Sequence, residues 1–203
     1  MPGKILVIAC GAIARELVRI QKLNDWGHVE FQCLPPELHN RPEKIPGAVL
    51  EAIESRKDHY ERIFVGYADC GTGGRLDRAL KGTGVERIPG AHCYEFFAGS
   101  EVFHKLAEEE PGSFYLTDFL VRHFEGVVWK GLGLDRQPEL SSLYFGNYKR
   151  VVYIAQAESG KLQEMAAEQA ERLGLAYEYR FRGDQPLSAL LQPILEELSL
   201  IHI

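Results

Sequence analysis

The sequence predicts an α/β fold, in which a mostly parallel sheet is flanked by helices in Rossmann-like layers around a helical central segment. The predicted strand at residues 4–9 contains the uninterrupted aliphatic run Ile5–Ala9, which is typical of a strand buried on both faces of a parallel sheet. Residues 12–23 then carry apolar side chains at helical spacing, and residues 29–34 alternate like a second strand. This β-α-β order favours parallel pairing of the two strands.

The same alternation of helix and strand continues along the chain. The later elements are predicted as helix 48–56, strand 62–67, helix 76–80, strand 85–88, strand 150–155, helix 161–173, strand 176–180 and helix 187–198. Between them, residues 95–148 are predicted to be mostly helical, with amphipathic stretches at 101–109 and 119–129. We therefore expect a single α/β domain over residues 1–203 with a helical insertion at about 95–148.

The composition narrows the classes of partner. The 203 residues are 45% hydrophobic and 26% charged, and the net charge is −6. An acidic chain without clustered Lys and Arg is poorly suited to nucleic acid. The apolar run Ile5–Ala9 is shorter than a signal-peptide core, and no run approaches the ~20 residues of a membrane span. We expect a cytoplasmic protein that binds neither nucleic acid nor membrane.

Three of the four cysteines follow predicted strands. Cys10 comes after the first strand, Cys70 after strand 62–67 and Cys93 after strand 85–88, whereas Cys33 lies inside an alternating strand and is predicted to be core. Because the carboxyl ends of parallel strands meet at one edge of a sheet, the three residues are expected to converge there. The glycines that follow Cys10 and Cys70 would let the backbone approach a ligand closely, and helix N-termini there would lower the thiol pKa values.

A convergence of thiolates predicts a metal site. Cysteine sulfur and histidine nitrogen are the ligands that zinc and iron–sulfur clusters prefer, and His92 is the natural fourth ligand beside Cys10, Cys70 and Cys93. The sequence leaves zinc and an iron–sulfur cluster as open alternatives. Cysteine is also among the most buried residue types, so each thiol taken singly is as compatible with a core position.

Three polar residues are predicted to act near these cysteines. His39 and Arg41 follow the second strand, where His39 could transfer protons and both could bind an anionic small-molecule substrate. Asp69 precedes Cys70 and could act as an acid or base or orient a ligand, although capping the helix after Gly74 is equally compatible. The glycines at 71–74 lack the phosphate-loop pattern, which disfavours ordinary nucleotide binding.

Four ordered motifs resemble a bacterial and archaeal domain-of-unknown-function family, the one numbered sixteen thirty-eight. The motifs are Ala9-Cys10, Leu38-His39-Asn40-Arg41-Pro42-Glu43, Gly66-Tyr67-Ala68-Asp69-Cys70-Gly71 and Ile88-Pro89-Gly90-Ala91-His92-Cys93. Members tend to be encoded beside corrinoid-dependent methyltransferase systems, so the resemblance implies one-carbon or methyl-group chemistry. It carries over to Cys10, His39, Arg41, Cys70, His92 and Cys93. Members usually show His-Asp-Cys where this chain has His92 and Cys93 directly adjacent.

The leading prediction is a metal-dependent enzyme, a transferase or lyase, that uses this Cys/His site on a small molecule. The alternative is a non-catalytic accessory protein that binds a corrinoid cofactor, a corrinoid protein or a methyltransferase, with His39 or His92 as the lower ligand to cobalt. A third alternative is a metal-free thiol enzyme with Cys70 as the nucleophile. A homo-oligomer is compatible with each of them.

Overall fold

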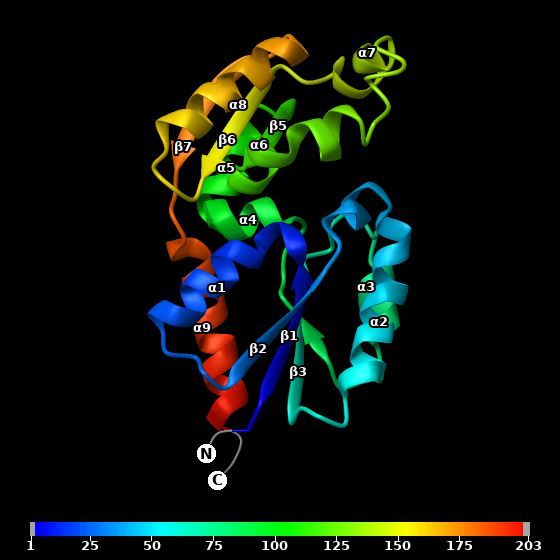
Figure 1. Ribbon diagram of the computed structural model, residues 1–203, viewed down its shortest axis with the longest axis vertical. Helices are drawn as coiled ribbons and strands as arrows, with labels where there is room; N and C mark the ends of the chain where they lie inside the picture. The colour runs from blue at the N-terminus through cyan, green and yellow to red at the C-terminus, as the bar shows by residue number, and fades with distance from the viewer. Residues whose placement is uncertain (1–2, 201–203) are drawn as a thin grey trace. The chain divides into compact units, whose positions relative to one another are not determined.

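The computed structural model of the protein describes residues 3–200, and side chains up to residue 197. The chain forms two compact units, Met1–Cys93 with Leu187–Ile203, and Tyr94–Pro186. Each unit is built on its own all-parallel sheet with helices packed against it (Figure 1). The predicted α/β class, with parallel strands flanked by helices, is confirmed.

The first unit contains a sheet of four strands in the order β2-β1-β3-β4. The strands are β1 (Ile5–Cys10), β2 (Val29–Leu34), β3 (Arg62–Gly66) and β4 (Glu86–Arg87). The aliphatic run of β1 occupies the middle of the sheet, and its side chains from Ile5 to Ala9 are at most 2% exposed. Complete burial on both faces explains why this strand is continuously apolar.

Helices cover both faces of this first sheet. In Figure 1, α1 (Ala14–Leu23) and α9 (Gln185–Leu200) lie on one face, and α2 (Ile45–Arg56) and α3 (Arg75–Leu80) lie on the other. Short 3-10 helices precede two of them: η1 (Gly11–Ile13) before α1, and η2 (Pro36–Asn40) with η3 (Pro42–Lys44) before α2. At the junction with the second unit, α4 (Cys93–Ala98) begins at Cys93.

The second unit holds a sheet of three strands in the order β5-β6-β7. These are β5 (Ser113–Thr117), β6 (Arg150–Ala155) and β7 (Ala176–Phe181). Its helices are α5 (Ser100–Glu109), α6 (Asp118–Phe124), the π-helical turn η4 (Glu125–Trp129), α7 (Leu140–Phe145) and α8 (Gly160–Leu173). Buried residues of β5, β6, α6 and α8 form one hydrophobic core there.

The central segment differs from the sequence-based expectation. Residues 95–148 were expected to be helical, but they include β5, which pairs in parallel with β6 along its whole length. A strand of five residues is too short for its periodicity to be distinguished from that of a helix, and its partner lies far along the chain. The prediction of a single α/β domain over residues 1–203 stays a prediction. Within the described residues, no helix has the length and apolar character needed to cross a lipid bilayer.

Candidate thiol site

Backbone hydrogen bonds join the loops that carry Cys70 and Cys93. The Asp69 N–H donates to the Gly90 carbonyl at 3.1 Å, and the Cys70 N–H donates to the Ala91 carbonyl at 2.9 Å. These bonds place the segment after β3 alongside the segment after β4, and the Cys93 side chain hydrogen-bonds to that of Cys70. Two of the three predicted strand-end thiols therefore meet directly.

Cys10 reaches the same edge of the sheet from β1. Its sulfur accepts a hydrogen bond from the Ala12 N–H at 3.4 Å. The charge of Cys70 contributes to raising the pKa of Cys10, and the charge of Cys10 contributes to raising the pKa of Cys93. A Cβ placed on Gly11 would lie only 3.0 Å from the Leu34 carbonyl oxygen, so glycine allows the turn after β1 to pack against the end of β2. The strand ends therefore bring the three cysteines close enough for their charges to affect one another's pKa values.

The loop with His39 and Arg41 lies beside the Cys70 loop. A Cβ placed on Gly71 would be 3.6 Å from the Cβ of Pro42, which directly follows Arg41. Arg41 is exposed, and within the described residues its guanidinium makes no ion pair or hydrogen bond. His39 has much of its surface open to solvent, but partial burial of the ring, together with the nearby His92, lowers its pKa. Both predicted substrate-binding residues thus belong to a loop that contacts the thiol site.

Cys70 has an unusual backbone conformation. Its φ of 47° lies in the left-handed region, which residues with a Cβ seldom adopt, and the residue is only 7% exposed. Strained backbone of this kind persists where surrounding contacts fix it, and it clusters at functional sites. Here the bond from Cys70 to Ala91 and the turn that follows provide those contacts.

Asp69 holds the turn after Cys70. Its carboxylate accepts hydrogen bonds from the Thr72 hydroxyl at 2.6 Å, the Gly73 N–H at 3.0 Å and the Gly74 N–H at 2.7 Å. These bonds, led by that from Thr72, keep the pKa of Asp69 below its ordinary range. The contacts hold the turn before α3, whose N-cap residue is Gly74 and receives no side-chain cap hydrogen bond. The predicted acid–base role of Asp69 stays a prediction.

The three thiols differ in acidity. The hydrogen bond from the Cys93 side chain lowers the pKa of Cys70 despite its burial, and the backbone N–H of Cys93 assists. The hydrogen bond to Cys70 holds the proton on Cys93 and, together with burial, raises the pKa of Cys93 well above its ordinary range. Burial raises the pKa of Cys10 to about 11. Cys70 is therefore the first of the three to become a thiolate.

Sequence reasoning missed Tyr67, which follows β3 directly. The side chain is 2% exposed, and its hydroxyl makes no hydrogen bond of good geometry with any described residue, yet it lies close enough to Cys10 to interact with the thiol. Burial and the adjacent Cys10 raise the pKa of Tyr67. Tyr67 ends an apolar run, so the sequence pattern alone indicated a core residue. An aromatic side chain with a hydroxyl group at a strand end was the feature that could have marked it as a site residue.

Cys33 is not a core residue, which corrects the prediction made for it. It lies on β2, an edge strand of the four-stranded sheet, opposite Ala9 of β1, and its side chain is exposed. Burial along β2 does not alternate strictly, because Glu30 and Cys33 are exposed although they lie on opposite faces of the strand. Cys33 is still near enough to influence the charge states of Cys10 and Tyr67.

The cysteine and histidine side chains of the site are of the types that a thiophilic metal prefers. Whether they can bind a metal also depends on their positions. Within residues 3–200, no group of three or more His, Cys, Asp or Glu side chains is positioned so that it could hold a metal ion. The thiols of Cys70 and Cys93 are instead engaged with each other. Metal binding by Cys10, Cys70, Cys93 and His92 stays a prediction.

A second polar cluster, in the second unit, was also missed. Asp118 directly follows β5 and is 1% exposed. It accepts hydrogen bonds from the Tyr153 hydroxyl at 2.7 Å and the Gln156 N–H at 3.0 Å, and Arg122 lies 3.8 Å from its other oxygen. The network ties together the carboxyl ends of β5 and β6. A buried carboxylate at a strand end would have been visible in the sequence had β5 been recognised.

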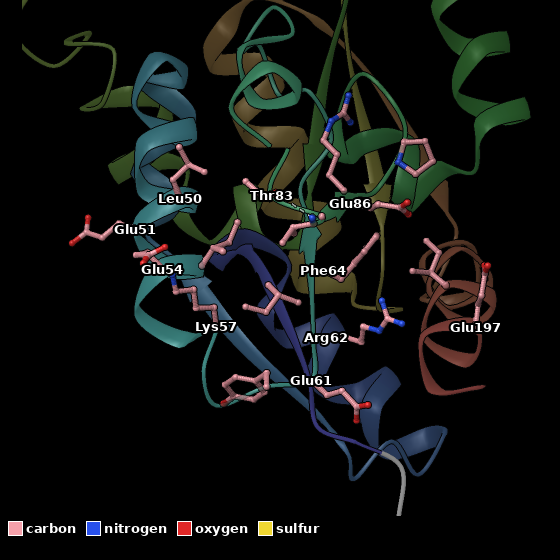
Figure 2. A pocket seen from close by; sticks show the side chains of 18 of the residues that line it. Leu50, Glu51, Glu54, Lys57, Glu61, Arg62, Phe64, Thr83, Glu86 and Glu197 are labelled. Carbon is pink, nitrogen blue, oxygen red and sulfur yellow. Dashed lines mark hydrogen bonds and ion pairs between the residues drawn. The ribbon is translucent and has the colours of Figure 1, made fainter. Parts of the chain in front are cut away.

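A pocket of about 1150 Å³ lies elsewhere in the first unit (Figure 2). It is lined by the end of α2, the first residues of β3, the approach to β4 and one side of α9, and none of the predicted site residues lines it. Figure 2 shows Glu54 and Lys57 from α2, Glu61 and Arg62 at β3, and Glu197 from α9 around it. The lining runs from Glu61 and Arg62 at the amino end of β3 to Arg87 and Pro89 at the carboxyl end of β4.

Fold and site together define an α/β protein with a cysteine cluster at the carboxyl edge of its N-terminal parallel sheet. A family model described as protein of unknown function, DUF1638, matches residues 33–191, and the chain belongs to this family. The predicted resemblance is confirmed. The match includes Cys70 and Cys93, whereas Cys10 precedes it. No curated protein and no solved structure matches the chain.

Proposed function

We propose that the protein is an enzyme that acts on a small molecule through the thiolate of Cys70, with Cys93 as its proton partner. The observation that carries this proposal is that backbone hydrogen bonds join the loops of the two cysteines, where the Cys93 side chain lowers the pKa of Cys70. The thiolate, not the thiol, is the nucleophilic form of cysteine, so a depressed pKa activates it near neutral pH.

The roles follow from the contacts of the site. The sulfur of Cys70 forms a bond to an electrophilic carbon of the substrate, and the departing group takes the proton of Cys93. A second nucleophile then gives its proton to Cys93 and displaces Cys70 from that carbon, which restores both the Cys70 thiolate and the Cys93 thiol. Arg41 offers an unpaired guanidinium to an anionic part of the substrate, and His39, with its lowered pKa, is a neutral base in the adjoining loop.

A metal-dependent form of the same site is the second candidate, favoured by the third thiol. Cys10 raises the pKa of Cys93 through its charge, so full ionisation of the cluster requires a cation to offset the repulsion. Cys10, Cys70, Cys93 and His92 would hold zinc or an iron–sulfur centre. A bound zinc would activate a thiol acceptor, which suits the transfer of a methyl or other one-carbon group.

Ultraviolet thiolate absorbance, measured across pH on protein purified without oxygen or chelator, tests both forms when it is combined with metal and sulfide analysis. For the thiol enzyme, one cysteine ionises below the ordinary value of about 8.5. That ionisation disappears in Cys70→Ala, moves to higher pH in Cys93→Ala and is unchanged in the control Cys33→Ala. Stoichiometric zinc or iron, lost from each of Cys10→Ala, Cys70→Ala and Cys93→Ala, would favour the metal form. Metal-free protein with no early thiol ionisation would refute both.

A non-catalytic role in binding a corrinoid or a methyltransferase subunit rests on a different observation. The lowered pKa of His39 keeps its imidazole neutral, which is the form that coordinates cobalt, and His92 is near it. A cobalamin spectrum that shifts on addition of the protein, and does not shift with His39→Ala, would support this role. An unchanged spectrum would remove the corrinoid version.

A further inference from the structure

The strand β7 leaves one edge of the second sheet open. Within the described part of the chain its one strand neighbour is β6, beside which it lies in Figure 1. Two large aromatic side chains of this strand are exposed, Tyr177 by 36% and Phe181 by 46%. Natural sheets usually protect an edge with short strands, prolines or charged side chains; β7 has six residues and no proline or lysine, and its charged residues are Glu178 and Arg180.

The exposed aromatics continue the hydrophobic core to the edge of the sheet. Tyr177, Tyr179 and Phe181 are in register with Val151, Tyr153 and Ala155 of β6, all three of which belong to the buried core of this unit. Tyr179 packs partly against that core, with its ring centroid 5.7 Å from that of Tyr153. The hydrophobic core therefore extends to a row of aromatic side chains on the edge strand β7, two of which are exposed.

The backbone groups of the same three residues point away from β6. The Ala176 N–H donates to Lys149 and the Arg182 N–H donates to Ala155, so the even-numbered residues of β7 make the ladder with β6. By alternation, the N–H and C=O groups of the odd-numbered residues face outward. No backbone hydrogen bond from Tyr177, Tyr179 or Phe181 to another described residue lies outside the sheet.

We propose that a second copy of this chain pairs antiparallel with β7, around a two-fold axis at Tyr179. In this register Tyr179 faces its own symmetry mate, and Tyr177 faces Phe181 of the other copy. Each of these pairs joins outward-facing residues, which exchange both backbone hydrogen bonds. The two three-stranded sheets become one continuous sheet through an isologous interface, and the aromatic rows of both copies cover one another.

Charge selects this register over its neighbours. Glu178 and Arg180 project from the opposite face of β7, where Glu178 is paired with Arg150 and Arg180 of its own chain. Pairing around Tyr179 sets Glu178 opposite Arg180 of the other copy. A slip that centres the axis on residue 178 or 180 would instead oppose Glu to Glu or Arg to Arg, which is unfavourable. The strand is thus complementary to itself in one antiparallel register.

Disulfide trapping in the full-length chain tests the axis position. Tyr179→Cys and Tyr177→Cys are each made in a Cys33→Ser background, because Cys33 is exposed, and both are oxidised under the same mild conditions. Across a hydrogen-bonded antiparallel pair the Cα atoms are about 5.5 Å apart, within disulfide reach. Two copies of residue 177 would be four residues out of register, roughly 13 Å apart.

The expected result is a dimer by light scattering for the native chain, and covalent dimers from Tyr179→Cys at least tenfold faster than from Tyr177→Cys. Arg180→Glu should weaken the native dimer at least tenfold, whereas the same charge change at the exposed Arg136 should leave it intact. A native chain that remains monomeric at micromolar concentration, or equal cross-linking of both cysteine variants, would overturn the proposal. Binding of an unrelated strand by a monomeric chain would also overturn it.

Discussion

Replacing Asp69 with alanine separates its structural role from the catalytic role that the sequence suggested. The carboxylate accepts three hydrogen bonds in the turn after Cys70, from Thr72, Gly73 and Gly74. Bonds to a charged acceptor contribute about 1.5–3 kcal/mol each when buried, but this turn is partly open to solvent. We expect Asp69→Ala to lower the free energy of unfolding by about 2–3 kcal/mol in total.

Urea unfolding at neutral pH measures this loss, and Asp58→Ala is the matched control because Asp58 is exposed and accepts no hydrogen bond from a described residue. Since the folded pKa of Asp69 is depressed, its stabilisation is present above the unfolded value of about 3.9 and is lost as pH falls through the folded pKa. The difference between Asp69→Ala and the native chain should therefore shrink in acid. Unfolding energies that agree within about 0.5 kcal/mol at neutral pH would refute the structural role.

Two further stability predictions follow from close contacts. Gly11→Ala should lower the free energy of unfolding by about 1–3 kcal/mol, because the new Cβ would press on the Leu34 carbonyl. Gly47→Ala in α2 meets nothing within 4 Å and should raise the free energy of unfolding by about 0.5–1 kcal/mol. Equal urea midpoints for the two variants would contradict this prediction. Arg150→Ala should cost about 3 kcal/mol, since Arg150 makes three hydrogen bonds within the second unit, one of which is its ion pair with Glu178 at 2.6 Å. The exposed Lys149 should tolerate alanine at under about 1 kcal/mol, and a loss at Arg150 no larger than this would contradict the assignment.

The sequence was sufficient for those parts of the fold that a local pattern or a topological rule determines. The aliphatic run Ile5–Ala9 indicated a central parallel strand, because only a strand covered on both faces needs apolar side chains at every position. The rule that parallel strands end at one edge then brought together the loops of Cys10, Cys70 and Cys93. Both inferences depend on backbone direction alone, which the order of elements reveals.

Other features depend on contacts that no local pattern encodes. Strand β5 becomes a strand through pairing with β6, and Cys33 is exposed because β2 forms the edge of its sheet. The difference in acidity between Cys70 and Cys93 arises from one shared proton, which requires the two side chains to face each other. Tyr67 gains significance only because it is buried next to a thiol.

The return of the chain to its first unit makes the order of synthesis important. The first unit lacks one helix until α9 has been made, and buried leucines of that helix, Leu187, Leu191 and Leu195, complete its core. During synthesis the whole second unit precedes α9, so the sheet that carries the cysteines gains this helix only after the second unit has been made. A premature stop near residue 186 would spare every cysteine, yet it would leave the sheet beneath them with only α1 on the face that α1 and α9 share.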